Sequence, residues 1–280
     1  GYGIDIEFSE DGKYLAVGED DKTARVFRTE KWDSLYTFKP AEGWCGGCPT
    51  FVAFSKDGKY LAKLSRKEKL KIFDLQTGKK IKETGIEVDE IAGLKYSNDG
   101  KRILVAAEKK ITEYEAGSGK IINTINIPDD KGELNEIIYN ADESEVICAF
   151  GKNIAISFNL KTGKESRVYK GIINLQDAGG LNYDPDNYRE SYIAKYLRLK
   201  NPLVLTNDNK NFITGKTGTK SVMWSLETGS PIRFFSEHAK AVVCMDISKD
   251  GKLLATGDGS GEVNIWQISN GKKIKTFKGH

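Results

Sequence analysis

The sequence has few cysteines and histidines and no long apolar run. No stretch approaches the roughly 18 apolar residues that cross a bilayer, and the polar start GYGIDIEF is not a secretory signal peptide. The chain has 4 cysteines in 280 residues and no Asn-x-Ser/Thr sequon, which fits a reducing compartment better than a disulfide-stapled secreted domain. We therefore expect a cytoplasmic protein without a membrane span.

The chain also lacks a large excess of charge of either sign. The chain holds 43 Lys and Arg against 40 Asp and Glu, a net charge of +3, and no long block of like charge. This argues weakly against a dedicated DNA or RNA binder, because such proteins carry basic arms or patches. Hydrophobic residues make up 39% of the chain, enough for one large domain or two small ones. The first residue is Gly1, so the chain is compatible with a processed protein or a piece of a longer one.

Repetition organises the sequence. A ten-residue pattern built around a Ser-x-Asp-Gly turn occurs in six copies, two of them degenerate. The copies are SEDGKYLAVG from Ser9, SKDGKYLAKL from Ser55, SNDGKRILVA from Ser97, NADESEVICA from Asn140, TNDNKNFITG from Thr206 and SKDGKLLATG from Ser248. Successive starts are 46, 42, 43, 66 and 42 residues apart (55−9, 97−55, 140−97, 206−140 and 248−206), so one interval holds an insertion.

Each copy contains the same order of short alternating segments and turns. In the last copy AVVCMDIS is followed by the SKDG turn, LLATG, a glycine-rich turn, VNIWQIS, an SNGK turn and KIKTF. Four short strands joined by tight turns form a small antiparallel sheet whose apolar face must be covered by a neighbouring sheet. A period near 42 residues with four strands per copy predicts a β-propeller.

The repeats resemble those of the WD40 family, in which the third strand of each repeat ends in Trp-Asp. All six matching positions are aromatic here, and one keeps the Asp: Phe27-Arg28, Phe73-Asp74, Tyr114-Glu115, Phe158-Asn159, Trp224-Ser225 and Trp266-Gln267. The resemblance implies an all-β propeller of four-stranded antiparallel blades in a single domain, 1–280. The expected blades are about 3–40, 49–85, 90–127, 134–171, 202–236 and 240–280.

The resemblance also implies a buried polar network, made in the family by a His, a Ser or Thr, an Asp and the Trp of one repeat. Only the last copy approaches this set, with His238, Thr256 and Trp266, while Ser260 stands where we expect the Asp. His238 therefore has a structural interpretation rather than that of a general base. The first four copies lack the His, so we expect apolar packing to hold their blades.

The number of blades stays open at this stage. From Ser248 through the C-terminus and back to Ser9 the chain counts 41 residues (280−248+9), one ordinary period. Six blades can then close through side-chain contacts alone, which we favour slightly. The other interpretation is that a seventh blade belongs to sequence outside this chain.

The long interval places an insertion at 172–201, between the fourth and fifth blades. Asp184 followed by Pro185 is typical of a helix start, and tyrosines and a leucine then recur at spacings of four and three. One interpretation is that this stripe packs back onto blades four and five. The other is a docking site, because Tyr and Arg are enriched at interface hot spots. The candidate docking residues are Tyr188, Arg189, Tyr192, Tyr196 and Arg198.

The stretch WCGGCP, from Trp44 to Pro49, contains two of the four cysteines. Redox chemistry of a Cys-x-x-Cys needs a helix N-terminus, but Pro49 and a strand follow here. A structural zinc needs two further ligands, and Cys148 and Cys244 fall in predicted strands, where we expect them to be buried. The remaining interpretation is a glycine-rich turn that exposes Trp44, with thiols able to form a disulfide on oxidation. Trp44 is the better candidate for partner binding.

The sequence contains no evident nucleophile–base pair, metal cluster or cofactor motif. We therefore expect no catalytic residues, no metal and no cofactor, and predict a non-catalytic scaffold that binds protein partners, as part of a larger complex, through the loop-bearing face and the insertion. The alternative is an accessory subunit that positions a catalytic partner, for example an RNA-modifying enzyme. Salt-sensitive RNA binding would distinguish this alternative from a pure protein scaffold.

Overall fold

The computed structural model describes residues 3–40, 47–85, 87–150, 154–170, 202–217 and 219–278. These residues form six four-stranded antiparallel sheets, and the helix described among them is a three-residue 3₁₀ turn, η1 (Asp129–Lys131). The expected all-β class with six blades of this type is therefore confirmed. The predicted helix in 172–201 lies outside the described residues. No described helix is long and apolar enough to cross a membrane.

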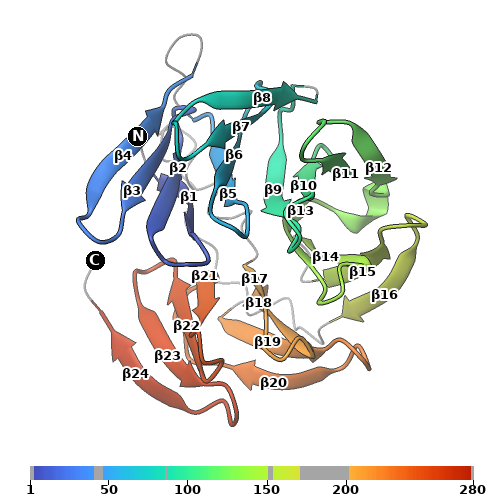
Figure 1. The fold of residues 1–280 in the computed structure, drawn as a ribbon. Coiled ribbons are helices and arrows are strands. Elements are labelled where there is room, and N and C mark those ends of the chain that lie inside the picture. Colours follow the sequence, from blue (N-terminus) through green and yellow to red (C-terminus); the bar gives the residue numbers. More distant parts are fainter. Residues whose placement is uncertain are drawn as a thin grey trace, which may run out of the picture. The chain divides into compact units, whose positions relative to one another are not determined.

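The chain divides into two compact units, 1–128 and 129–280. Figure 1 shows three blades in each unit, with strands that follow one another both in the chain and in the sheet.

The strands of the first unit are β1 (Gly3–Phe8), β2 (Tyr14–Glu19), β3 (Ala24–Arg28) and β4 (Asp33–Phe38) in blade 1; β5 (Thr50–Phe54), β6 (Tyr60–Ser65), β7 (Leu70–Asp74) and β8 (Lys80–Thr84) in blade 2; and β9 (Ile91–Tyr96), β10 (Arg102–Ala107), β11 (Lys110–Glu115) and β12 (Ile121–Asn126) in blade 3.

Those of the second unit are β13 (Leu134–Tyr139), β14 (Glu145–Phe150), β15 (Ile154–Asn159) and β16 (Glu165–Lys170) in blade 4; β17 (Leu203–Leu205), β18 (Asn211–Thr217), β19 (Lys220–Ser225) and β20 (Pro231–Phe235) in blade 5; and β21 (Val242–Ile247), β22 (Leu253–Asp258), β23 (Val263–Gln267) and β24 (Lys273–Phe277) in blade 6.

The Ser-x-Asp-Gly pattern forms the turn between the first two strands of a blade. In blade 1 the Ser9 hydroxyl donates to Asp11 Oδ1 (2.8 Å) and accepts the Tyr14 N–H (3.0 Å). Gly12 has φ of 70°, a left-handed conformation that glycine adopts without steric cost. The degenerate copies keep this conformation with Glu143 and Asn209, both at φ of 57°. The repeated motif of the sequence is therefore a turn that reverses the chain between paired strands.

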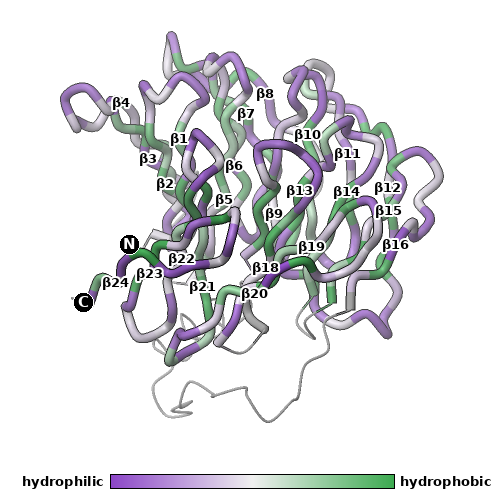
Figure 2. Tube along the Cα trace, turned by 90° about the horizontal axis from the view of Figure 1, so that it is seen from below, coloured by the Kyte–Doolittle hydropathy of each residue, from purple (hydrophilic) through white to green (hydrophobic). Residues whose placement is uncertain are grey.

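Within each unit the core lies between neighbouring blades. In the first unit Val26 and Phe38 of blade 1 pack with Phe54 and Phe73 of blade 2. In the second unit Phe235 of blade 5 packs with the ring of Trp266 in blade 6, and the two ring centroids are 5.9 Å apart. Figure 2 shows the same pattern along the chain: the hydrophobic stretches follow the strands and the turns are mostly hydrophilic. Each blade thus buries the apolar face of its neighbour.

Side chains of outer strands also hold the next blade in the chain. Arg233 on β20 donates from Nη1 to the carbonyl oxygen of Ile268, in the outer turn of blade 6 (2.6 Å). Arg167 on β16 likewise donates to the carbonyl oxygen of Leu226 in blade 5, and in the first unit the Thr84 hydroxyl donates to that of Gly119 (2.7 Å). Neighbouring blades are thus joined by hydrogen bonds at their rims as well as by apolar packing.

Candidate functional site

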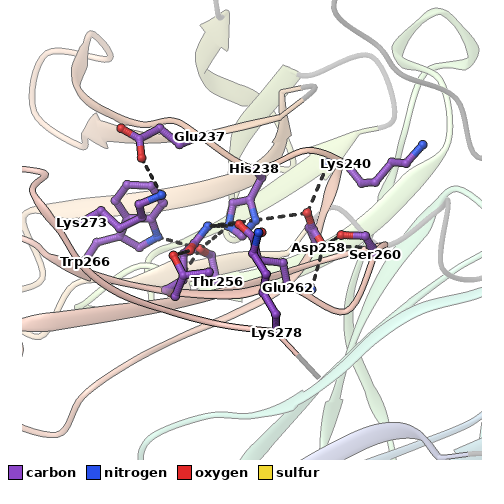
Figure 3. A network of polar contacts seen from close by, with 12 residues as sticks. Glu237, His238, Lys240, Thr256, Asp258, Ser260, Glu262, Trp266, Lys273 and Lys278 are labelled. Carbon is purple, nitrogen blue, oxygen red and sulfur yellow. Dashed lines mark hydrogen bonds and ion pairs between the residues drawn. The ribbon is translucent and has the colours of Figure 1, made fainter. Parts of the chain in front are cut away.

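The polar network that the sequence predicts in blade 6 is present and is shown in Figure 3. Its centre is the Thr256 hydroxyl on β22, which accepts the indole N–H of Trp266 (2.7 Å). The same hydroxyl lies 2.7 Å from Nε2 of His238, a residue of the segment that leads into β21. Thr256 and Trp266 are diagonal neighbours on one face of the sheet, because the antiparallel register pairs Thr256 with Asn264 and Leu254 with Trp266.

The acidic member of the network is Asp258, not a residue at position 260. Asp258 Oδ2 lies 3.4 Å from His238 Nδ1, and Oδ1 accepts the Ser260 hydroxyl (2.6 Å) and backbone N–H (2.9 Å). Ser260 stands at the position where the resemblance implies an Asp, and the carboxylate is supplied from two residues earlier. Ser260 instead supports the carboxylate, as a second layer of the network.

Burial determines the charge state of this network. Burial lowers the pKa of His238 below its usual value, although the nearby Asp258 acts in the opposite direction. Burial opposes ionisation of Asp258, but hydrogen bonds from Ser260 and Glu262 outweigh it and leave the pKa of Asp258 below its usual value. A neutral His238 can donate from Nδ1 to the carboxylate and accept the Thr256 hydroxyl at Nε2, which links all four residues in one direction.

The network has no access for a substrate. The side chains of His238 and Asp258 are 1% and 0% exposed. A general acid–base pair has to reach the proton that it transfers, whereas the hydrogen-bonding partners that these two side chains have among the described residues belong to blade 6 or to the segment that leads into it. This geometry favours a structural role for the network.

Blade 5 contains part of the same network, which the sequence analysis missed. Trp224 on β19 donates its indole N–H to the Thr214 hydroxyl on β18 (3.0 Å), and Trp224 is 1% exposed. The signal was present in the sequence, because Thr214 precedes Trp224 by ten residues just as Thr256 precedes Trp266. The degenerate turn of this copy hid the correspondence.

Blade 2 fills the equivalent positions with an ionic cluster, which we name the Lys63 cluster: Lys63, Glu68 and Lys71. Lys63 pairs across the strands with Lys71 as Thr256 does with Asn264, and the aromatic residue follows two positions later in both blades. Lys63 Nζ lies 2.9 Å from Glu68 Oε2, and Lys71 Nζ lies 3.0 Å from Oε1. The three side chains are 1%, 10% and 10% exposed in the order named.

This cluster corrects the expectation that blade 2 relies on apolar packing alone. Burial lowers the pKa of Lys63, although Glu68 acts in the opposite direction. Burial opposes ionisation of Glu68, and the two ammonium groups still hold the pKa of Glu68 below its usual value. From the sequence alone, lysines within a strand are expected at the surface. Only the packed structure shows that Lys63 and Lys71 share the buried carboxylate of Glu68.

The candidate docking residues Trp44, Tyr188, Arg189, Tyr192, Tyr196 and Arg198 lie outside the described residues. Of the cysteines, Cys48 is disulfide-bonded, so this thiol is not in the reduced form that the composition suggested. Cys148 and Cys244 form no disulfide. Cys148 is buried as expected, but Cys244 on β21 is exposed, so its predicted burial was wrong. No group of three or more His, Cys, Asp or Glu side chains suited to a metal occurs within the described ranges.

A family model confirms what these blades indicate. The model "WD domain, G-beta repeat" matches residues 2–28 and 229–267, which include the third strand of blade 1 and the Thr256–Trp266 pair of blade 6. The chain belongs to the WD40 repeat family. The matches cover parts of blade 1, blade 5 and blade 6, whereas the other copies are recognised by their strands and turns.

Curated relatives of this WD40 protein are similar to it at low identity. The serine-threonine kinase receptor-associated protein of Gallus gallus is 20% identical over 273 residues, 96% of this chain and 68% of that protein. The WD repeat-containing protein WDS homolog of Arabidopsis thaliana is 20% identical over 285 residues, 98% of this chain and 49% of that protein. U3 small nucleolar RNA-interacting protein 2 of Mus musculus is 33% identical over 89 residues, 28% of this chain and 19% of that protein. The chain thus spans only part of the length of these relatives.

Proposed function

We propose that this WD40 protein is a non-catalytic scaffold that binds protein partners and works within a larger complex. The observation that carries the proposal is the buried network of blade 6. The His–Asp pair most similar to a catalytic dyad is closed to solvent, and its hydrogen bonds hold a blade together. WD40 proteins generally act as interaction scaffolds, and the receptor-associated relative is named for an association rather than for a reaction. Fold alone does not fix function, so the proposal depends on a binding test.

The proposed docking elements are the insertion at 172–201 and the loop that contains Trp44. The tyrosines and arginines of the insertion have the side chains that dominate binding energy at protein interfaces. We place this scaffold in the cytoplasm, on the basis of composition.

Affinity capture from a cell lysate, with each purified chain as the bait, tests this function. The intact protein is compared with a variant in which 172–201 is replaced by a short Gly-Ser loop, and with the point variants Tyr188→Ala, Tyr192→Ala and Tyr196→Ala. We expect the loop variant to lose specific partners, and at least one point variant to reproduce the loss with the purified partner. Each variant must keep the circular dichroism and melting temperature of the intact chain. Capture of the same proteins by all variants would contradict docking through the insertion, and Trp44→Ala would then test the other loop.

One similarity favours a second candidate function, that of an accessory subunit in an RNA-modifying complex. The mouse relative is named for interaction with a small nucleolar RNA. A direct test is binding of purified protein to structured RNA at two salt concentrations. RNA affinity that falls steeply between about 50 and 200 mM salt would support this candidate, because phosphate contacts release counterions. Absence of RNA binding at low salt would contradict it.

A further inference from the structure

The turn between the third and fourth strands has one fixed conformation throughout the molecule. In five blades a glycine with φ between 69° and 75° takes the same position of this turn: Gly78, Gly119, Gly163, Gly229 and Gly271. In blade 2 the Gly78 N–H donates to the carbonyl oxygen of Asp74 (2.8 Å), and the other four turns repeat this bond. Glycine fits the position because it adopts the left-handed region without the steric cost that a Cβ brings.

Blade 1 has Trp32 at this position. The Trp32 N–H donates to the carbonyl oxygen of Arg28 (2.8 Å), so the turn is the same, and φ is 52°. The other non-glycine residues with positive φ in the described part of the chain are all polar: Lys22, Lys67, Glu108, Lys109, Glu143, Asn209 and Glu237. A bulky apolar residue in the left-handed region is an outlier that costs conformational energy.

Trp32 also leaves most of its side chain in water, since the residue is 64% exposed. The turn does not need the ring for its geometry. Arg28 and Asp33 form an ion pair across it, and the Thr29 hydroxyl donates to the carbonyl oxygen of Gly12 in the neighbouring turn (2.6 Å). The position therefore combines backbone strain with an exposed aromatic surface that the hydrogen bonds and the ion pair of the turn do not require. Such a combination points to a function outside the folded chain.

Charge around Trp32 indicates what kind of group would bind. The two adjoining turns, 9–13 and 28–33, contain four acidic residues and three basic ones. Asp11 is paired with Lys13 and Asp33 with Arg28, so these four charges are largely balanced within the turns. Glu10 and Glu30 are exposed, and Lys31 alone offsets them. The indole is also the aromatic ring that attracts a cation most strongly.

We propose that Trp32 anchors a partner segment that carries an Arg or Lys side chain, with the cation over the indole ring and its charge toward Glu30. The proposal rests on the scaffold function and adds to it a third docking point. This point lies on the turn between β3 and β4, on the part of blade 1 where the turn between β1 and β2 also lies, since the two turns are hydrogen-bonded to each other.

Selection from a random twelve-residue peptide library displayed on phage tests this anchor. The library is selected on the full chain and, in parallel, on Trp32→Gly, which restores the residue found in the other five blades. We expect peptides that bind the full chain to lose about tenfold or more in affinity for Trp32→Gly, and to be enriched in Arg and Lys. The control variant Ile121→Ser removes an apolar residue that is similarly exposed (59%) and should leave peptide affinity unchanged.

The melting temperature distinguishes an anchor from a structural residue. Trp32→Gly relieves the strained conformation, so we expect the melting temperature to stay the same or to rise while peptide affinity falls. A lower melting temperature would overturn the proposal by giving Trp32 a structural role. Peptides bound equally by both chains, or Trp32-dependent peptides rich in acidic residues, would also overturn it. Because the selection can be repeated on the chain without 172–201, its outcome is independent of whether the insertion docks partners.

Discussion

Blades 2 and 6 both bury a polar side chain at the same position of the repeat, but blade 6 pairs it with neutral groups and blade 2 with charged ones. Each has a polar residue on its second strand, facing the preceding blade beside the aromatic residue of the third strand. In blade 6 this residue is Thr256, which links Trp266 to a neutral His238. In blade 2 it is Lys63, and two ammonium groups share the carboxylate of Glu68. In both blades the polar residue at this buried position is therefore hydrogen-bonded, and the chemistry that does so can be neutral or ionic.

The neutral network of blade 6 and the ionic cluster of blade 2 differ in the energetic cost of losing one member. A neutral network that loses one member leaves a buried donor or acceptor unpaired, which costs about 1–3 kcal/mol per group. An ionic cluster that loses its carboxylate leaves charge uncompensated in a site with little water, which costs more. The comparison between the blades can thus be tested by removing single members of each set.

We expect the largest effect from Glu68→Gln. The change keeps the shape of the side chain but leaves two buried ammonium groups without a counter-charge, and the free energy of unfolding should fall by about 3–5 kcal/mol. Urea denaturation followed by circular dichroism measures the loss. The matched control is Glu83→Gln, which breaks an exposed ion pair with Lys80 and should cost less than about 1 kcal/mol. Equal effects of the two changes would show that the Lys63 cluster is not buried as described.

Thr256→Val should come next. Valine matches threonine in shape but has no hydroxyl, so the indole N–H of Trp266 and Nε2 of His238 both lose their partner. We expect the free energy of unfolding to fall by about 3 kcal/mol in a denaturant titration.

Thr214→Val in blade 5 is the smaller version of the same change. It removes one hydrogen bond, that of Trp224, and should cost about 1–2 kcal/mol. If Thr214→Val proved as costly as Thr256→Val, the His238 contact would contribute nothing to blade 6.

Replacing the whole Lys63 cluster by apolar residues tests whether the cost of Glu68→Gln comes from unpaired charge. A triple variant, Lys63→Met, Glu68→Leu and Lys71→Met, removes charge and carboxylate together and leaves no buried ion unpaired. Buried ion pairs replaced by apolar residues of similar size are often neutral or stabilising. We therefore expect the melting temperature to remain within a few degrees of the parent protein, in contrast to Glu68→Gln alone. A loss as large as that of the single variant would mean that the ions specify the packing of blade 2.

The smallest expected effect is a pH dependence specific to blade 6. The pKa of His238 in the folded protein lies below its unfolded value near 6.5. Folding therefore favours the neutral ring, so the stability that it contributes is complete above pH 6.5 and falls as the pH drops below that value. The difference in unfolding free energy between the parent and His238→Asn, measured from pH 7.5 to pH 5, should shrink toward acid. A difference that grows toward acid would require a charged His238 in the fold.

The sequence predicted the strands and turns well because they depend on local patterns. The Ser-x-Asp-Gly turn and the aromatic end of the third strand are short-range signals, and both are found where the repeats placed them. The network in blade 6 was predicted in part. The resemblance named His238, Thr256 and Trp266, which the structure brings into contact, and it placed Ser260 at the position of the Asp, whereas the carboxylate of the network comes from Asp258.

The remaining features required the packed structure. Thr214 and Trp224 bond because the register of β18 and β19, which pairs Thr214 with Val222 and Phe212 with Trp224, makes them diagonal neighbours on one face of the sheet. Lys63 and Lys71 are the single lysines of β6 and β7, and no local pattern shows that a lysine within a strand will be buried against a neighbouring blade. Trp32 was overlooked because its left-handed backbone becomes visible only when six turns are compared in three dimensions.

The arginine side chains that bond to the outer turn of the following blade predict an order in which the blades of the second unit unfold. Arg167 holds the outer turn of blade 5, and Arg233 holds that of blade 6. When blade 4 opens, the turn carbonyls of blade 5 therefore lose their arginine donor. When blade 5 opens, in contrast, the arginine of blade 4 can still bond with water. Amide hydrogen exchange in the second unit should then spread along the chain from blade 4 toward blade 6, and an Arg167→Met variant should speed exchange in blade 5 before it does so in blade 4.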